Sequence, residues 1–335
     1  MLDFAQNFNV FTPDIKSIIP KNLDYIFRYP DYKHTLLINS ISKKFNLDKE
    51  SIAIGNGATE IIFTLPLVIK KQKIIIVSPT FWEYSFANIE RGRKNIENYL
   101  LKEELNFKLD VKDLNRHLTA NSVVYICNPN NPTSSMTKKE ELYNLISVNP
   151  DTNFVIDETY LIFREDYEEQ SLLEISTKVN NLFVITSLSK IYSVPGLRVG
   201  FLAAHPDKIR LYYQNSIPYL TNPLLEHIIP KLLNQDKFLN KTRKFYSKQR
   251  KFMFDKFSSM FKSKLKVYEP FANFVLLKIL NSQTSTEVVA DLGLKGYIAR
   301  DGNDFLGLGN KWIRTAIRSN FSNEQLFEAL HKIIQ

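Results

Sequence analysis

The amino-acid sequence predicts an α/β fold with a largely parallel sheet that is covered by helices on both faces. Short apolar runs of strand length alternate with segments of helical spacing between residues 52 and 201. The runs are continuously apolar, which is typical of strands buried on both faces. With 335 residues, the chain is long enough for one large domain and a second, smaller one.

The N-terminal part leads into this pattern. Residues 1–33 are rich in turn-forming residues, and residues 36–45 have helical spacing. A short strand then begins at Ile52 and turns through two glycines, the second of them Gly57, into a helix. Backbone N–H groups at the start of that helix and the hydroxyl of Thr59 form a candidate anion site. The alternative is an ordinary glycine-rich turn, because the segment is neither a Walker loop nor a dinucleotide-binding fingerprint.

Each of the next apolar runs ends in polar or aromatic residues. The expected strands are residues 74–77, 123–127, 153–156 and 182–185. The residues that follow these strands include Phe81, Asn131, Asp157, Tyr160 and Lys190. Ligands of such sheets bind beyond the carboxyl ends of the strands, so these side chains are predicted to meet. Their convergence is stronger evidence for a functional site than any single motif.

A lysine at the end of a buried strand is poorly placed to act as a solubilising residue. Burial disfavours the ammonium form of Lys190, so its pKa falls and the free amine becomes a nucleophile that can form a Schiff base with an aldehyde. Ser187, Ser189 and Arg198 can bind a dianion nearby through hydroxyl and guanidinium donors. On this stretch alone, a lysine that reaches solvent beside a surface arginine is an equally good interpretation.

The C-terminal third differs in pattern. Residues 226–261 are expected to be largely helical, with a break or kink near Pro230. We interpret their basic residues, among them Arg243 and Arg250, as a solvated helix face; a polyanion site is the less favoured alternative. Short strands are expected near residues 265–268, 274–278, 297–300 and 313–317, with helices near 286–292 and from residue 323.

These patterns divide the chain into three parts. Residues 1–33 form an N-terminal segment that packs on the small domain. Residues 34–235 form the large domain, and residues 236–335 form a smaller α+β domain.

Composition narrows the class of protein. The net charge is +9, but Lys and Arg are spread along the chain and no nucleic-acid-binding module is recognisable. The single cysteine, Cys127, excludes an intramolecular disulfide and is interpreted as a buried, inert thiol in a reducing compartment. The N-terminus lacks the pattern of a signal peptide, and no apolar run reaches membrane-spanning length. We therefore expect a cytoplasmic protein without a nucleic-acid or membrane partner.

The strand-end residues match the needs of one cofactor, an electron sink with an aldehyde, a pyridine ring and a phosphate. Lys190 suits the aldehyde, and the carboxylate of Asp157 suits the ring nitrogen. Asn131 and Tyr160 can donate to the ring oxygen, and Phe81 can stack on the ring face. The expected phosphate cradle consists of Gly57, Ala58, Thr59, Ser187, Ser189 and Arg198. No metal site is expected.

The same residues lie in motifs that resemble the class I/II aminotransferases, which are fold-type I enzymes that use pyridoxal 5′-phosphate. The motifs are Ser-Leu-Ser-Lys followed by Pro-Gly-Leu-Arg-Val-Gly, Asn-Pro-Asn-Asn-Pro-Thr, and Asp-Glu-Thr-Tyr. The resemblance covers nearly the whole chain and implies a three-layer αβα large domain. It also implies a homodimer in which Tyr29 reaches the cofactor phosphate of the neighbouring subunit. Ser134 departs from the pattern, since the family usually has glycine there.

Two branches of the family are similar, histidinol-phosphate aminotransferases and the cobalamin-pathway decarboxylases of threonine O-phosphate. The resemblance to the decarboxylases is the closer one in residues 300–308, 313–319 and 1–9. The decarboxylases also have a His-Gly-Gly-Asn segment, which lies upstream of the position that matches the start of this sequence. The resemblance implies that Asn7, Asn222, Arg300 and Arg314 contact the substrate, a small phosphorylated amino acid or amine. Arg318 is instead expected in a surface ion pair.

Geometry at the substrate Cα decides the reaction, because the bond perpendicular to the cofactor ring breaks most easily. Arginines that pin the carboxylate in the ring plane expose the C–H bond to Lys190, and transamination follows. Arginines that bind a phosphate instead leave the carboxylate free to depart as carbon dioxide. We favour decarboxylation of phosphoserine or phosphothreonine, with transamination against glutamate as the alternative. A non-catalytic relative is disfavoured because both Lys190 and Asp157 are present.

Overall fold

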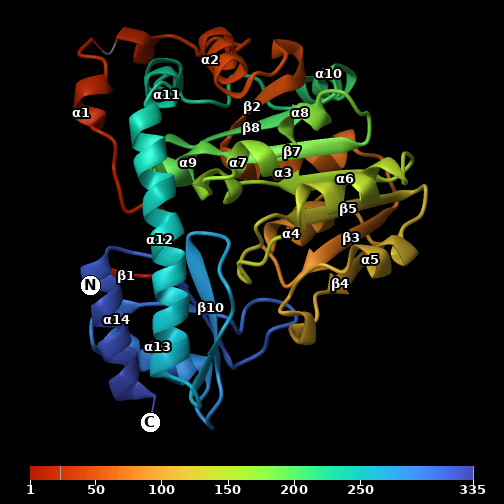
Figure 1. Ribbon diagram of the computed structural model, residues 1–335. Coiled ribbons are helices and arrows are strands. Elements are labelled where there is room, and N and C mark those ends of the chain that lie inside the picture. Colours follow the sequence, from red (N-terminus) through yellow and green to blue (C-terminus); the bar gives the residue numbers. More distant parts are fainter. Residues whose placement is uncertain (23, 335) are drawn as a thin grey trace.

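The computed structural model describes residues 1–22 and 24–334, and its centre is a seven-stranded sheet (Figure 1). The strand order is β2-β8-β7-β6-β5-β3-β4. Strands β3 to β7 run parallel, whereas β8 is antiparallel to both of its neighbours, so the expected mostly parallel sheet is confirmed. The strands are β2 (Ile52–Asn56), β3 (Lys73–Ser78), β4 (Ile96–Leu100), β5 (Ser122–Cys127), β6 (Asn153–Asp157), β7 (Leu182–Ser187) and β8 (Val199–Ala204).

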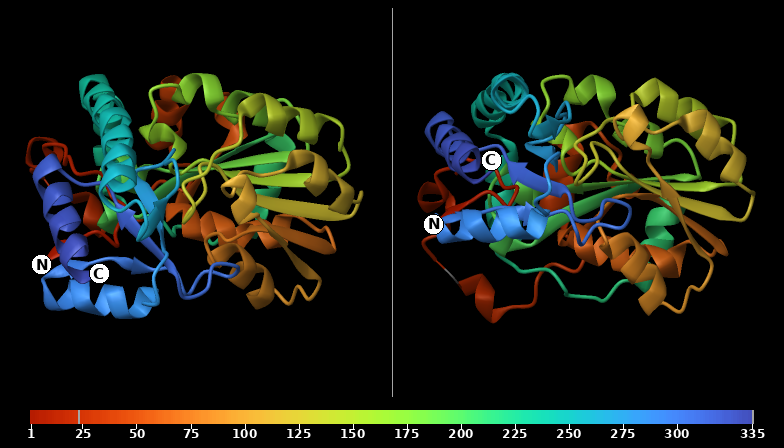
Figure 2. Two further views of the ribbon diagram at one scale, coloured as in Figure 1. Left: turned by 60° about the horizontal axis from the view of Figure 1, so that its bottom comes forward. Right: turned by 90° about the horizontal axis from the view of Figure 1, so that it is seen from below.

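Helices cover both faces of this sheet (Figure 2). One face packs on α3 (Gly57–Val68), α4 (Glu83–Glu90) and α10 (Pro206–Asn215). The other packs on α2 (Thr35–Phe45), α5 (Val111–His117), α6 (Lys139–Ser147), α7 (Tyr167–Gln170), α8 (Leu173–Ser176) and α11 (Leu225–Leu233). Successive strand residues point to opposite faces, so Val124 and Ile126 join one core while Tyr125 and Cys127 join the other. Burial on both faces explains the continuously apolar strand sequences.

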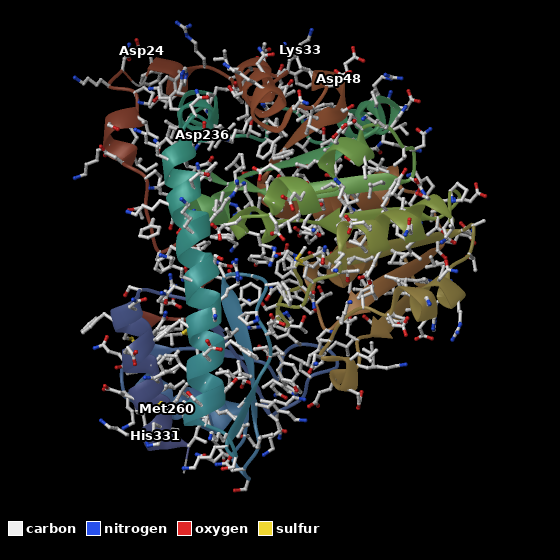
Figure 3. All side chains as sticks on the ribbon, viewed as in Figure 1. Asp24, Lys33, Asp48, Asp236, Met260 and His331 are labelled. Carbon is white, nitrogen blue, oxygen red and sulfur yellow. The ribbon has the colours of Figure 1, made fainter. Side chains whose placement is uncertain are left out.

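A second sheet lies beside the carboxyl ends of the parallel strands. Its four strands are antiparallel in the order β12-β13-β10-β9. They are β9 (Leu265–Val267), β10 (Phe274–Ile279), β12 (Arg300–Asp301) and β13 (Trp312–Ala316), and they pack with α13 (Ser285–Leu294) and α14 (Asn320–Ile333). The long helix α12 (Asp236–Met260), labelled at both ends in Figure 3, runs alongside both sheets.

The first residues of the N-terminal segment lie on this second unit. Strand β1 (Leu2–Asp3) pairs in parallel with β11 (Tyr297–Ile298), and the Ala316 N–H donates to the Phe4 carbonyl. The remaining short helices are α1 (Ile15–Ile18), η1 (Asp24–Phe27), η2 (Lys49–Ser51), η3 (Glu103–Leu105), η4 (Leu161–Phe163), α9 (Leu188–Ile191) and η5 (Pro195–Leu197). The predicted division at residues 33/34 and 235/236 stays a prediction. It puts every strand of the large sheet in one part and every strand of the four-stranded sheet in another.

The predicted helix break near Pro230 was wrong in position. Pro230 lies inside α11, and the helical stretch is interrupted at Asn234 and Gln235 instead. A proline in a helix interior removes one backbone hydrogen bond and crowds the preceding turn. The buried residues of α11, which include Ile228, Ile229 and Leu232, keep the segment helical by packing against the core.

The basic residues of α12 are not all solvated. Arg243 and Arg250 are buried, and burial lowers the pKa of Arg250 to about 10. The Arg243 Nε donates to the Ile162 carbonyl at 3.1 Å, and the Arg250 Nη1 donates to the Phe163 carbonyl at 3.4 Å. These arginines satisfy carbonyls of η4, which begins directly after Tyr160, so they brace the segment behind that residue. The helix thus has a buried face with Arg243 and Arg250 and an exposed face with other basic residues. The closely spaced charges in the sequence do not distinguish these two faces.

The expected surface ion pair of Arg318 was also wrong. The Arg318 Nε donates to the Asp3 carbonyl at 2.8 Å, and its Nη2 donates to the Gln6 carbonyl at 2.6 Å. The side chain therefore fastens the N-terminal segment to the end of β13. The sequence pattern also missed β4, an edge strand in which Glu97 and Asn98 interrupt the apolar run. Among residues 1–22 and 24–334, no helix combines the length and apolarity needed to cross a membrane.

Arg318→Ala should loosen the N-terminal segment, because two hydrogen bonds from a charged donor are lost and each contributes about 1.5–3 kcal/mol. The amides of Leu2 and Phe4, which donate to the carbonyls of Gly296 and Ile298, should exchange with deuterium about tenfold faster or more. Arg116→Ala, which removes an exposed arginine from α5, is the matched control. Equal exchange in both variants would contradict the role of Arg318.

Candidate active site

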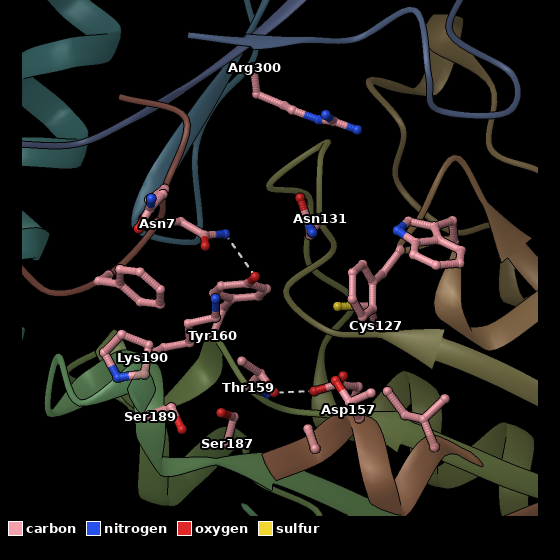
Figure 4. Close-up of a pocket in the computed structure, with 18 of the residues that line it drawn as sticks. Asn7, Cys127, Asn131, Asp157, Thr159, Tyr160, Ser187, Ser189, Lys190 and Arg300 are labelled. Atoms are coloured by element: carbon pink, nitrogen blue, oxygen red, sulfur yellow. Dashed lines mark hydrogen bonds between the residues drawn. The ribbon is translucent and has the colours of Figure 1, made fainter. Parts of the chain in front are cut away.

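A cavity of about 410 Å³ opens between the carboxyl ends of the parallel strands, the N-terminal segment and the small sheet (Figure 4). The predicted site residues that line it are Asn7, Ala58, Thr59, Phe81, Asn131, Asp157, Tyr160, Ser187, Ser189, Lys190, Arg198, Arg300 and Arg314. They come from segments far apart in the sequence. The alternation of strands and helices brings them together, because each parallel strand ends at the same edge of the sheet.

Asp157 is the last residue of β6, and its side chain is 5% exposed. The Tyr84 hydroxyl donates to Oδ2 at 2.7 Å, and the Thr159 N–H donates to Oδ1 at 2.9 Å. Burial raises the pKa of Asp157, and these hydrogen bonds act in the opposite direction. The carboxylate is thus held in one orientation at the base of the cavity, where a cationic ring nitrogen would be a suitable partner.

Lys190 lies on the short helix α9, which follows β7 directly. Burial, together with the charges of Arg314 and Arg198, lowers the pKa of its amine to about 8. The Nζ atom lies 4.2 Å from the centre of the Phe8 ring. The amine is therefore available as a nucleophile near neutral pH, whereas an ordinary lysine would be almost fully protonated.

The turn from β2 into α3 packs tightly against Arg198. Gly57 has φ +76°, and a Cβ atom there would lie 2.5 Å from the Arg198 Nη2. A Cβ on Gly200, in β8, would lie 2.7 Å from the Ala58 nitrogen. Only glycine permits these approaches, and they bring the α3 N-terminus and the guanidinium to one place. Backbone amides and a guanidinium so arranged are a suitable cradle for a phosphate.

The hydroxyl of Ser189, which is predicted to belong to the phosphate cradle, makes two hydrogen bonds within the protein. Its Oγ accepts a hydrogen bond from the Val199 N–H and donates one to the Val199 carbonyl, both at 3.2 Å. Ser189 therefore also ties α9 to the first residue of β8. Ser187 ends β7 and lines the cavity.

Tyr160 and Asn131 are connected to the N-terminal segment and the small sheet. The Asn7 Nδ2 donates to the Tyr160 hydroxyl at 2.7 Å, as drawn in Figure 4. The Arg314 Nη1 donates to the Asn131 Oδ1 at 2.5 Å, and its Nη2 donates to the Ala5 carbonyl. Burial lowers the pKa of Arg314 to about 10. The Arg314 Nε is buried without a hydrogen-bond partner in the described residues, so this guanidinium retains a free donor.

Arg300 is the more exposed of the two arginines that are predicted to contact the substrate. Its Nη2 lies 3.1 Å from the Asp304 Oδ2, and its guanidinium lies over the Phe305 ring at 5.3 Å. Arg300 stands opposite Arg314 in the antiparallel register of β12 and β13. The two cations thus approach the cavity from neighbouring strands.

Three predicted site residues do not line this cavity: Gly57, which packs against Arg198 as described above, Tyr29 and Asn222. Tyr29 is 84% exposed, and its ring packs against Tyr219 with ring centres 5.1 Å apart. Asn222 is exposed, and its Oδ1 accepts a hydrogen bond from the Leu224 N–H at 2.9 Å. Tyr29 was expected to serve the neighbouring subunit, and all three assignments stay predictions.

Several cavity residues were not predicted from the sequence, among them Phe8, Trp82, Tyr84, Thr159 and Phe305. Tyr84 lies only three residues after Phe81, in the Pro-Thr-Phe-Trp-Glu-Tyr stretch, but nothing in the sequence pairs it with Asp157. Cys127 also lines the cavity, and burial raises the pKa of its thiol, which keeps it protonated.

Ser134, the departure from the family pattern, has φ +59°. Its Oγ accepts hydrogen bonds from the N–H groups of Phe271 and Ala272 at 3.1 and 2.9 Å. The serine therefore links the loop that carries Asn131 to the segment before β10. The hydroxyl supplies contacts between the two units that a glycine could not make.

Comparison with known proteins agrees with this geometry. The family model for aminotransferase class I and II matches residues 2–333. The chain belongs to the class I and II aminotransferase family. It is 31% identical over 328 residues to a histidinol-phosphate aminotransferase of Methanococcus aeolicus, covering 96% of this chain and 86% of that protein. It is equally 31% identical over 312 residues to an L-serine phosphate decarboxylase of Campylobacter jejuni, covering 90% and 78%.

The fold agrees as well. The structure of the histidinol-phosphate aminotransferase from Clostridium acetobutylicum superposes with a TM-score of 0.91 at 24% identity, covering 99% of both chains. The aminotransferase-like fold, with a mostly parallel central sheet and a separate small antiparallel sheet, is thus confirmed. Members of this family are enzymes that use pyridoxal 5′-phosphate, and so does this chain.

The residues of the cavity fit this cofactor. The glycine approaches around Arg198 leave room for a phosphate, and the buried, oriented Asp157 suits the ring nitrogen. Lys190 would hold the aldehyde, and Asn131 and Tyr160 would contact the ring oxygen. The Asn131 Oδ1 accepts a hydrogen bond from Arg314, so the Asn131 Nδ2 points away from that contact. The Nδ2 group would then donate to the ring oxygen.

Gly57→Ala should weaken binding of pyridoxal 5′-phosphate by about tenfold or more. The added Cβ would displace the Arg198 guanidinium, and a non-glycine residue at positive φ costs about 1–2 kcal/mol. Gly92→Ala is a matched control, because Gly92 has φ +73° but open space at its Cβ position. Spectroscopic titration of the cofactor-free variants measures the effect. Equal losses of affinity would show that strain alone is responsible.

Proposed function

We propose that this enzyme removes the carboxyl group of a small O-phospho-amino acid, phosphoserine or phosphothreonine, to give the phospho-amino-alcohol. The observation that carries the proposal is the pair formed by Arg300 and Arg314, which stand opposite each other on β12 and β13 beside the cavity. Two guanidinium groups suit a phosphate dianion better than a single carboxylate, because together they match its two negative charges. The serine phosphate decarboxylase relative supports the same substrate class.

The chain's own residues divide the remaining work. The bound pyridoxal 5′-phosphate supplies an aldehyde that links covalently to an amine and a protonated ring that accepts the electron pair of the broken bond. Asp157, held by Tyr84 and Thr159, keeps a proton on the ring nitrogen. Lys190, with its lowered pKa, would hold the cofactor aldehyde and would carry a proton beside the substrate Cα.

The choice of bond then depends on what the arginines bind. With the substrate phosphate between Arg300 and Arg314, neither arginine would hold the carboxylate in the ring plane, and the carboxylate could leave as carbon dioxide. Phe81 and Phe305 line the cavity and exclude water, which favours loss of charge from the carboxylate. Lys190, which lines the same cavity, would return a proton to that carbon.

Transamination of a phosphorylated substrate with glutamate is the second candidate, and one observation favours it. Arg314 is hydrogen-bonded to Asn131, which is expected at the ring oxygen, so a carboxylate bound by Arg314 would lie near the ring plane. That arrangement holds the carboxylate in place and exposes the C–H bond to Lys190. The histidinol-phosphate aminotransferase relative supports this alternative.

Incubation with phosphoserine or phosphothreonine, with and without 2-oxoglutarate, separates the two reactions. We expect carbon dioxide and the phospho-amino-alcohol to form without the keto acid. Glutamate formed only from 2-oxoglutarate would identify a transaminase and overturn decarboxylation. Lys190→Ala is the control, since it should abolish turnover with either substrate. Full turnover in that variant would remove Lys190 from the mechanism.

We also propose a homodimer in which Tyr29 completes the partner's phosphate cradle. Support comes from the exposure of neighbouring apolar residues, with Phe27 82%, Tyr29 84% and Ile217 67% exposed. Large exposed side chains of this kind are typical of an interface.

Mixing Tyr29→Phe and Lys190→Ala chains tests this arrangement. Each variant alone should lose most of its activity, whereas a mixed dimer would contain one site with both Lys190 and Tyr29. Activity should therefore return after the two inactive variants are unfolded and refolded together. Its absence in a mixture that forms dimers would contradict the shared site.

A further inference from the structure

The segment from Phe4 to Val10 crosses one side of the cavity, and buried amides fasten it to both units. The Asn9 N–H donates to the carbonyl of Lys190 itself at 3.1 Å. The Asn9 Nδ2 donates to the Ile191 carbonyl at 2.7 Å and to the Thr242 Oγ1 at 3.0 Å. The backbone on the C-terminal side of Phe8 is therefore bonded directly to the helix that carries the lysine.

The residue on the other side of Phe8 is held equally firmly. Asn7 is 4% exposed, its Nδ2 donates to the Tyr160 hydroxyl, and its carbonyl accepts from the Asn273 Nδ2 at 2.8 Å. With both neighbours anchored, the Phe8 side chain has little freedom to move away. Its ring lines the cavity, with the centre of the ring 4.2 Å from the Lys190 Nζ.

The Lys190 amine otherwise meets charges of both signs. Arg314 from β13 and Arg198 after η5 disfavour its ammonium form, whereas Glu83 from α4 and Asp157 from β6 favour it. The face of an aromatic ring carries partial negative charge and attracts an ammonium within about 6 Å. The Phe8 ring, like the two carboxylates, therefore favours the ammonium form of Lys190. No ion pair among the described residues involves Lys190, whereas the ring is in contact with its amine.

We propose that Phe8 is a positioning residue for Lys190. The face of the Phe8 ring holds the ammonium form of the lysine amine on one side of the cavity. This inference rests on the proposed function of Lys190 as the cofactor lysine. The ring attracts the amine while it carries a proton and also keeps water from that side. The lysine thus retains a proton to deliver to the substrate carbon, although two arginines face it.

The ring attracts the ammonium and also excludes water, and these two effects predict opposite changes of the Lys190 pKa in separate variants. Leucine keeps most of the bulk but has no negative ring face, so Phe8→Leu should lower the pKa of Lys190 by about one unit. Alanine admits water, which stabilises the ammonium, so Phe8→Ala should raise that pKa. Phe8→Tyr keeps the ring and should leave the pKa near its original value.

Phe11, the residue that directly follows this segment, provides a matched control. Its ring lies 4.3 Å from the Lys241 Nζ and packs edge-on against Phe245 at 5.0 Å. Phe11→Leu therefore removes the same kind of contact, but at an exposed lysine outside the cavity. The pKa of Lys190 should not change in this variant.

The experiment measures the amine itself, in the full-length protein without cofactor. Acetic anhydride labels free amines, and mass spectrometry of the Lys190 peptide over a range of pH gives its pKa. We expect a fall for Phe8→Leu, a rise for Phe8→Ala and no change for Phe8→Tyr or Phe11→Leu. An unchanged pKa in Phe8→Leu, or equal shifts of one sign in Phe8→Leu and Phe8→Ala, would overturn the proposal.

A separate measurement isolates the proposed function of Lys190. Borohydride reduction of the cofactor-loaded protein should fix pyridoxal phosphate on the Lys190 peptide of the parent and of every Phe8 variant. Its attachment elsewhere would refute the role of the lysine. The effect of Phe8 on the amine is read independently, because the labelling experiment contains no cofactor.

Discussion

The cost of keeping two charged groups out of water governs the arrangement of this enzyme. Asp157 and Lys190 face one cavity at the carboxyl edge of the sheet, and burial shifts the pKa of each towards its neutral form. Tyr84 and Thr159 offset part of this cost for the carboxylate by donating hydrogen bonds. The same burial lowers the pKa of the amine and so makes it nucleophilic. Burial therefore both destabilises the charged forms of these groups and prepares the lysine for its reaction.

The N-terminal segment joins the parts that this cavity requires. Backbone carbonyls near its start accept from Arg314 and Arg318, while Asn7 and Asn9 donate to Tyr160 and to the lysine helix. One short stretch therefore contacts the small sheet and the large sheet together. Any movement between the two units must move this segment, and with it the wall of the cavity nearest to Lys190.

The sequence was most informative where one local pattern determines one element. Continuous apolar runs identified most strands of the central sheet, because burial on both faces leaves no other composition possible. It failed where packing decides the outcome. Pro230 stays inside α11 because that helix has a buried face, and Arg243 is buried because carbonyls of η4 lie beside it. In both cases the residues that pack against these side chains come from distant parts of the sequence.

The sequence by itself determined the family and therefore the cofactor, because Lys190, Asp157 and Asn131 stand in motifs whose order and spacing are specific. Only the tertiary structure decided what supports them. The hydrogen bond from Asn7 to Tyr160 spans 153 positions and that from Tyr84 to Asp157 spans 73, and Phe8 meets Lys190 across a longer separation than either. Hydrogen bonds and ring contacts depend on distances of a few ångströms, which spacing along the chain does not encode until the sheet has set which segments are neighbours.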